Sequence, residues 1–192
     1  MRTYNAFRGM VKFAANPQLG VITAEVQSLP KVSRSDLVPD AATLERIDRH
    51  TIVFSEHRDA LLASGRHLRR GLLLYGPPGT GKTHTLSYLI NAAPHRTAVI
   101  VSGTGFDMLS QAVGLARDLQ PAIVVLEDVD LVAEVRSWSQ GGEQALCCLS
   151  CSTKMDGLAA DVDVVFALTT NRVESLERAR WFREPETLSD AV

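Results

Sequence analysis

The stretch Gly76-Pro77-Pro78-Gly79-Thr80-Gly81-Lys82-Thr83 fits the pattern G-x-x-x-x-G-K-[ST] at every position. Its glycines let the backbone curl so that successive N–H groups face one point, where they can hold phosphate oxygens. Lys82 supplies a charge for the β- and γ-phosphates, and the Thr83 hydroxyl suits Mg²⁺. We therefore predict a nucleotide phosphate site. Its candidate residues are Gly76, Pro77, Pro78, Gly79, Thr80, Gly81, Lys82, Thr83 and the following His84.

The segments on either side of this loop support the prediction. Residues 71–75 (GLLLY) form a short apolar run, typical of a strand buried on both faces. A helix predicted at 82–92 directs the positive end of its dipole at the loop. This context argues against a chance glycine-rich turn. The sequence contains no N-K-x-D motif of the GTP-specific kind, so we expect ATP as the nucleotide.

Further along the chain, apolar runs alternate with helical patterns. Such alternation predicts an α/β fold in which a parallel sheet is covered on both faces. Before the loop, residues 1–40 are weakly patterned apart from a strand at 21–26, and residues 40–65 read as helical. The predicted core strands are 71–75, 97–101, 122–126 and 162–168, and the predicted helices are 82–92, 106–119 and 144–155.

Two acidic residues follow the third predicted core strand. Glu127 and Asp128, with Asp130 close behind, reach the sheet edge that carries the phosphate loop. One carboxylate can orient Mg²⁺ and the other can polarise the attacking water; the alternative is a solvated acidic turn. If the roles follow position, Glu127 serves the metal and Asp128 the water. Nucleotide hydrolases of this kind usually present Asp and then Glu, the reverse of the order here. Because Asp is one methylene shorter than Glu and reaches the water less well, we predict nucleotide binding with more support than fast hydrolysis.

The fourth predicted core strand ends in polar residues at the same edge. Asn171 follows it and is a candidate to hydrogen-bond the attacking water or the γ-phosphate. The alternative is a turn-forming Asn at a strand end. The candidate catalytic residues are Asp128, Glu127, Asn171 and Lys82, and the candidate Mg²⁺ ligands are Thr83, Glu127 and Asp128.

These three motifs (GPPGTGKT, AIVVLEDVD and ALTTNR) together resemble the AAA+ ATPases, in the AAA branch, over residues 36–178. The resemblance implies a P-loop NTPase three-layer sandwich with sheet order 5-1-4-3-2. It also implies an ATP site between subunits of a ring, usually a hexamer, that remodels protein substrates. By position, residues 76–83 are like Walker A, Glu127 and Asp128 like Walker B, and Asn171 like sensor 1.

The resemblance ends after Ala179. Neither Arg180 nor Arg183 lies in a recognisable arginine-finger motif, and we expect the fifth strand and the helical lid to be missing. The expected organisation is an N-terminal extension or linker at 1–40, the ATPase core at 41–179 and a divergent tail at 180–192. Because a neighbouring arginine commonly accelerates such reactions by orders of magnitude, we expect weak or absent activity from this chain alone.

Residues 146–154 depart from the amphipathic helix that the family has before its M-D-G-L motif. The stretch LCCLSCSTK has little apolar periodicity. One hypothesis is a compensated frameshift, since a two-base shift of a suitable coding sequence reads Leu-Leu-Asn-Glu; the alternative is an ordinary divergent helix. Cys147, Cys148 and Cys151 lie here without a nearby His, so we interpret them as free thiols and not as a zinc site.

Composition limits the remaining classes. The chain has 192 residues, 45% hydrophobic and 22% charged, with a formal net charge of -2. This size suits one α/β domain, and the charge gives no signal for nucleic acid. No apolar run approaches the roughly 20 residues of a membrane span and no signal-peptide core is present, so we expect a cytoplasmic protein.

The sequence therefore predicts ATP binding and hydrolysis by an AAA+ type domain that acts on protein substrates. Two alternatives remain: a nucleotide-binding module or truncated remnant with weak or no activity, and a P-loop kinase for small molecules. The kinase would need an acceptor pocket and a lid, for which the sequence after Asn171 gives no signal.

Overall fold

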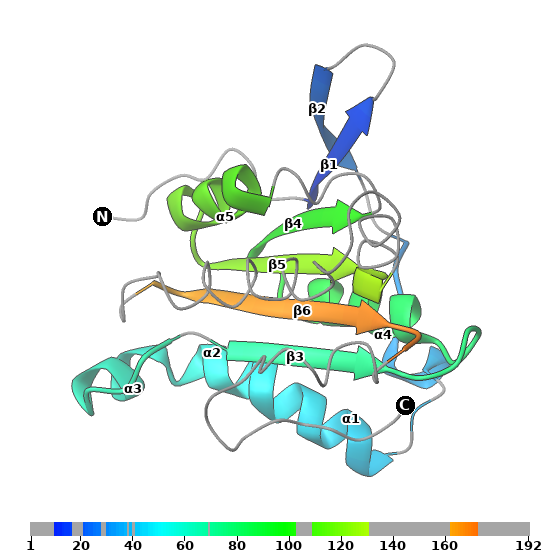
Figure 1. Ribbon diagram of the computed structural model, residues 1–192. Coiled ribbons are helices and arrows are strands. Elements are labelled where there is room, and N and C mark those ends of the chain that lie inside the picture. Colours follow the sequence, from blue (N-terminus) through cyan, green and yellow to red (C-terminus); the bar gives the residue numbers. More distant parts are fainter. Residues whose placement is uncertain are drawn as a thin grey trace.

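The computed structural model shows a six-stranded sheet in the order β2-β1-β4-β5-β6-β3 (Figure 1). The residues that the structure describes are 10–16, 21–27, 30–37, 39, 41–68, 70–102, 109–130 and 162–172. The strands are β1 (Met10–Asn16), β2 (Val21–Gln27), β3 (Arg70–Tyr75), β4 (Thr97–Ser102), β5 (Ala122–Glu127) and β6 (Val164–Thr170).

The four strands predicted for the core are parallel neighbours, in the order β3-β6-β5-β4. This is the 1-4-3-2 part of the expected order, and it confirms the α/β prediction. The apolar runs of β4, β5 and β6 form strands that are buried on both faces, whereas in β3 only Leu72 and Leu74 are buried and the alternate residues are half-buried. In β5, Ala122 to Leu126 are all buried, and β6 is buried throughout.

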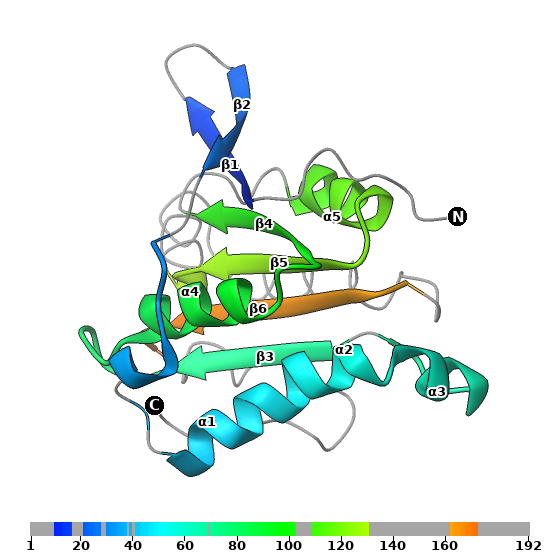
Figure 2. The same ribbon diagram turned by 180° about the vertical axis from the view of Figure 1, so that it is seen from behind.

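Helices cover the two faces of this sheet, which gives three layers. Alternate strand residues face opposite sides. Val124 and Leu126 of β5 share a cluster with α5 (Leu109–Asp118), whereas Ile123 and Val125 share another with α4 (Lys82–Ala92). Figure 2 shows α4 in front of the sheet, with β3 leading into it. This packing fixes α4, and with it the phosphate loop, against β3.

The helix predicted at 40–65 is interrupted in the structure. Its parts are α1 (Ala41–Asp48), a π-helical turn η2 (Arg49–Val53), α2 (Phe54–Glu56) and α3 (Arg58–Ala63), which begins after a break at His57. The Thr51 hydroxyl donates to the Ile47 carbonyl over 2.7 Å, a bond that competes with regular helical pairing. Gly65 ends this region, as predicted, with a φ of 72°. The amides of Gly65 and Arg66 donate to the last turn of α3 in the pattern of a Schellman cap.

A β-hairpin extends the sheet on its far side. The strand predicted at 21–26 is confirmed as β2 (Val21–Gln27), whereas β1 was not predicted. β1 pairs in parallel with β4, from Met10 opposite Ala98 to Phe13 opposite Val101, and antiparallel with β2. Both views show the hairpin projecting beyond β4 (Figures 1 and 2). A short 3-10 turn η1 (Arg34–Asp36) lies between this hairpin and α1.

The strand boundaries differ from the predictions by one or two residues: β2, β3, β4 and β5 are each one residue longer, and β6 is shifted by two. β6 covers Val164–Thr170 where residues 162–168 were expected, so both threonines belong to the strand. They extend it because Thr169 and Thr170 pair with Leu74 and Tyr75 of β3. Several predictions lie outside the described residues: the helix at 144–155 with its three cysteines, the frameshift hypothesis for 146–154, and the tail at 180–192.

Candidate nucleotide-binding site

The phosphate loop connects β3 to α4 through glycines in left-handed conformations. Gly79 has a φ of 83° and Gly81 a φ of 88°, values that L side chains adopt only with strain. A Cβ built on Gly79 would meet nothing within 4 Å, so backbone conformation alone calls for glycine there. The loop thus turns into the helix by the route that the motif predicts.

The start of α4 offers backbone donors to a ligand. The first turn is closed by the Thr85 N–H, which donates to the Gly81 carbonyl over 2.9 Å. The amides of Lys82, Thr83 and His84 precede this bond and therefore have no partner within the helix. Pro77 and Pro78 carry no N–H, so the donors of the loop begin at Gly79. A helix start of this kind favours bound anions.

Lys82 lies folded against its own loop. Its residue is only 7% exposed, and its Nζ donates to the carbonyl oxygens of Gly76 at 2.8 Å and Pro77 at 2.9 Å. The Thr80 hydroxyl donates to the same Pro77 carbonyl over 2.9 Å. These contacts hold the ammonium group at the centre of the loop, where the motif requires a charge for phosphate.

Two predicted site residues meet across the ends of β5 and β6. The Asn171 side-chain Nδ2 donates to Asp128 Oδ1 over 3.4 Å. Asp128 itself has a positive φ of 51°, a conformation that Asp tolerates better than most residues. Its N–H donates to the Thr169 hydroxyl over 2.9 Å. Asp128 thus turns out of β5 and lies against the end of β6.

The end of β6 is also joined to the phosphate loop. Tyr75 pairs with Thr170, and the Gly76 N–H donates to the Thr170 carbonyl over 3.4 Å. Glu127 pairs with Ser102 at the end of β4. The carboxyl ends of parallel strands share one edge, so the loop, the acidic pair and Asn171 all lie at the edge where such sheets bind ligands.

Asp130 also lies at this edge, and its role could not be read from the sequence. It is 5% exposed, and its Oδ1 accepts bonds from the Thr170 hydroxyl at 2.9 Å and from the Asn171 N–H at 3.1 Å. The spacing D-V-D after a buried strand was the available signal, but a spacing does not show which carboxylate is buried.

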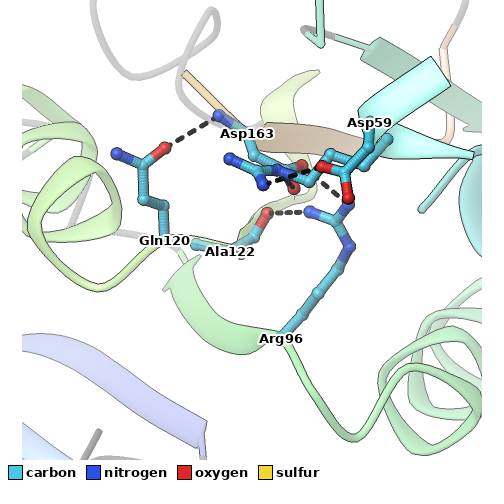
Figure 3. Close-up of polar contacts among 6 residues, drawn as sticks. Asp59, Arg96, Gln120, Ala122 and Asp163 are labelled. Atoms are coloured by element: carbon cyan, nitrogen blue, oxygen red, sulfur yellow. Dashed lines mark hydrogen bonds and ion pairs between the residues drawn. The ribbon is translucent and has the colours of Figure 1, made fainter. Parts of the chain in front are cut away.

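A second polar cluster lies at the opposite edge, where the strands begin (Figure 3). Arg96 precedes β4 and pairs with Asp163, which precedes β6, at 2.7 Å. Arg96 also donates to the Ala122 carbonyl over 3.3 Å, and the Asp163 N–H donates to Gln120 Oε1 over 2.9 Å. Arg58 of α3 reaches Asp163 at 3.3 Å. This cluster ties the amino ends of the strands together, remote from the phosphate loop.

The donors of the candidate site suit a hard cation. Mg²⁺ prefers oxygen ligands and commonly takes one or two protein oxygens together with phosphate and water. Exposed Thr83 and partly buried Glu127 and Asp128 offer such oxygens. Within the described residues, no group of three or more His, Cys, Asp and Glu is arranged to hold a metal by itself. The donor set therefore fits a metal that arrives with a phosphate ligand.

A parallel sheet with this loop between a buried strand and a helix defines a P-loop nucleotide-binding fold. The family model described as the ATPase family associated with various cellular activities (AAA) matches residues 72–186. The chain belongs to this family, which confirms the resemblance seen in the sequence.

Curated relatives agree with this assignment. The chain is 26% identical over 179 residues to the 26S protease regulatory subunit 6A of Caenorhabditis elegans, covering 88% of this chain and 42% of the relative. It is 28% identical over 182 residues to the 26S proteasome regulatory subunit 4 homolog B of Arabidopsis thaliana, covering 89% and 41%. The 26S proteasome regulatory subunit 6B homolog of Dictyostelium discoideum is 33% identical over 121 residues, covering 57% and 30%. The chain thus spans about two fifths of the length of the first two relatives.

None of the helices described in the structure is long and apolar enough to cross a membrane. The cytoplasmic location stays a prediction.

Proposed function

We propose that this chain binds ATP with Mg²⁺ at the edge where the phosphate loop meets the ends of β5 and β6, and hydrolyses it there. One observation carries the proposal: the contacting pair Asp128 and Asn171 shares this edge with the loop that holds Lys82. Membership of an ATPase family supports it.

Binding would rest on the loop amides, the start of α4 and Lys82. The amides from Gly79 onward supply donors for phosphate oxygens, and the helix dipole adds to their attraction. Lys82 contributes a full positive charge in a nearly buried position, where a charge-assisted bond to phosphate is strong. The Thr83 hydroxyl and the Glu127 carboxylate, with Asp128 beside it, would hold Mg²⁺. When bound, the ion would offset the negative charge on the phosphates.

Hydrolysis would rest on Asp128. Its carboxylate is partly exposed, and it would accept a hydrogen bond from water and orient that water for attack on the γ-phosphate. Asn171, which donates to Asp128 Oδ1, would hold that carboxylate in place and would itself hydrogen-bond the same water. Glu127 lies one residue earlier, and its partner in the sheet is Ser102 of β4. By its position as the first of the two acidic residues, Glu127 would take the metal role.

We extend the proposal to protein substrates and to assembly with other subunits. Its support is the set of relatives named as regulatory subunits of the 26S proteasome or protease. An ATP site between neighbouring subunits of a ring is the arrangement implied by the AAA resemblance, and it would let a neighbour contribute charge at the γ-phosphate.

The test measures phosphate release from Mg·ATP by the purified chain and by Asp128→Asn. Because a general base contributes roughly 100- to 10,000-fold, the variant should lose at least about 100-fold in turnover while ATP affinity changes little. Asp118→Asn, an exposed change on α5, is the matched control and should behave as the unaltered chain. Equal turnover by the chain and Asp128→Asn would refute the role of Asp128. Tight ATP binding without turnover would favour a nucleotide-binding module.

A further inference from the structure

We propose that Asp130 is a positioning residue, which holds the end of β6 so that Asn171 faces Asp128. The inference rests on the proposed function, in which Asp128 orients the attacking water. Asp130 lies two residues after Asp128 and is nearly buried, so its carboxylate serves neighbouring protein groups.

Asp130 connects the ends of β5 and β6 beyond the point where backbone pairing between the two strands stops. The last paired residues of β5 and β6 are Leu126 and Leu168. Beyond them, Asp130 Oδ1 accepts from the Thr170 hydroxyl at 2.9 Å and from the Asn171 N–H at 3.1 Å. One carboxylate oxygen therefore fixes Thr170, the last residue of β6, and Asn171, which follows it and carries the side chain that reaches Asp128.

The direction of these bonds is set by their neighbours. The Arg172 N–H donates to the Thr170 hydroxyl over 3.0 Å, so that hydroxyl turns its own hydrogen toward Asp130. A backbone N–H can only donate, so Asn171 also requires an acceptor at this place. Position 130 must supply an acceptor for two donors, and an apolar side chain would leave both without one.

The same residues connect the acidic strand end to the phosphate loop. The Thr170 hydroxyl donates to Asp130, and the Thr170 carbonyl accepts a hydrogen bond from the Gly76 N–H. Loss of the Asp130 bonds would release a segment that touches Asp128 on one side and the loop on the other. Misplacement by about 1 Å can lower a rate roughly 100-fold, so we expect Asp130 to affect turnover more than nucleotide affinity.

Two variants separate positioning from folding. Asp130→Leu removes both acceptors, whereas Asp130→Asn keeps an oxygen able to accept both bonds. Thr170→Val removes one of the two bonds to Asp130, together with the acceptor of the Arg172 N–H, with little change of shape, and it serves if Asp130→Leu does not fold. Asp118→Leu makes the same chemical change at an exposed site on α5 and is the control.

The full chain is measured in two ways. Phosphate release and binding of a fluorescent ATP analogue give turnover and affinity separately, and ¹⁵N NMR reports the side-chain amide of Asn171, assigned with Asn171→Ala. We expect Asp130→Leu, or Thr170→Val in its place, to lower turnover about 10- to 100-fold, to change affinity less than threefold and to shift the Asn171 signal. Asp130→Asn should restore turnover and signal.

An unchanged Asn171 signal and unchanged turnover in Asp130→Leu or Thr170→Val would overturn the proposal. So would an equal loss in Asp130→Asn, since that variant keeps both bonds. If the unaltered chain binds no ATP, the proposed function fails, and the Asn171 signal alone still decides whether Asp130 positions this side chain.

Discussion

Arg96 and Asp163 form an ion pair of 2.7 Å at the edge of the sheet opposite the phosphate loop, with side chains only 1% and 3% exposed (Figure 3). Arg96 lies before β4 and Asp163 before β6, with β5 between them. Buried charges are tolerated when they are paired and hydrogen-bonded; here the Arg96 guanidinium also donates to the Ala122 carbonyl, and the Asp163 carboxylate is also reached by Arg58. The pair therefore has a structural role in the sheet.

Asp163→Ala should lower the free energy of unfolding by about 3–5 kcal/mol, because it leaves Arg96 buried without its counter-charge. Chemical denaturation measures the change. Asp59→Ala is the control: Asp59 also pairs with Arg58, at 3.4 Å, but is 95% exposed, so its removal should change stability by less than about 0.5 kcal/mol. Equal effects of the two substitutions would contradict a buried structural pair.

Gly79→Ala should destabilise the chain by about 1–2 kcal/mol and weaken nucleotide binding, because alanine is strained at a φ of 83°. Gly114→Ala, inside α5, is a matched change: its Cβ also meets nothing within 4 Å, and its backbone is not left-handed. It should stabilise the chain by about 0.5–1 kcal/mol through helix propensity. Thermal unfolding without Mg·ATP measures the stability of each variant, and the added stability with Mg·ATP measures nucleotide binding. If the unfolding temperatures of the two variants shift in the same direction, the left-handed conformation of Gly79 is contradicted.

His95 should make the chain less stable in mild acid. His95 is exposed at the surface, but its partial desolvation lowers its pKa from the ordinary value of 6.5, and the positive charge of neighbouring Arg96 lowers it further, against smaller opposing effects of Asp163 and Glu56. The unfolded chain therefore binds this proton more readily than the folded chain. The folded state therefore has its full stability above pH 6.5. It loses stability as the pH falls from 6.5, the ordinary pKa of histidine, through the lower pKa that His95 has in the folded chain.

The corresponding experiment compares unfolding of the chain and of His95→Gln between pH 5 and pH 8, a window set around the ordinary value of about 6.5. The variant should lose less stability on acidification than the unaltered chain. If the two curves run parallel across this range, the pKa of His95 is not lowered by folding.

The central strands and the loop were predictable because each has a strong local signal. Residues 122–126 are apolar without interruption, and burial on both faces of a parallel sheet requires such a run. The glycines of residues 76–83 are set by backbone conformations that other residues avoid. β1 (MVKFAAN) has no comparable pattern; its place depends on pairing with β4, which lies far along the chain.

The missed polar contacts have the same explanation. Asp130 resembles any acid in an acidic turn, and only the arrival of Thr170 and Asn171 from β6 makes it a buried acceptor. Arg96 and Asp163 likewise meet only when β4 and β6 are placed on either side of β5. Residue type predicted the chemistry of the loop, but contacts between distant segments required the fold.

Calorimetric titration of the folded chain with Mg·ATP tests the central claim most directly. We expect saturable binding that Lys82→Ala weakens about 10- to 100-fold, the equivalent of one strong charged hydrogen bond, while Lys31→Ala, an exposed change, leaves it unaltered. No heat of binding by the folded chain, or equal affinities of Lys82→Ala and Lys31→Ala, would contradict a phosphate site at this loop.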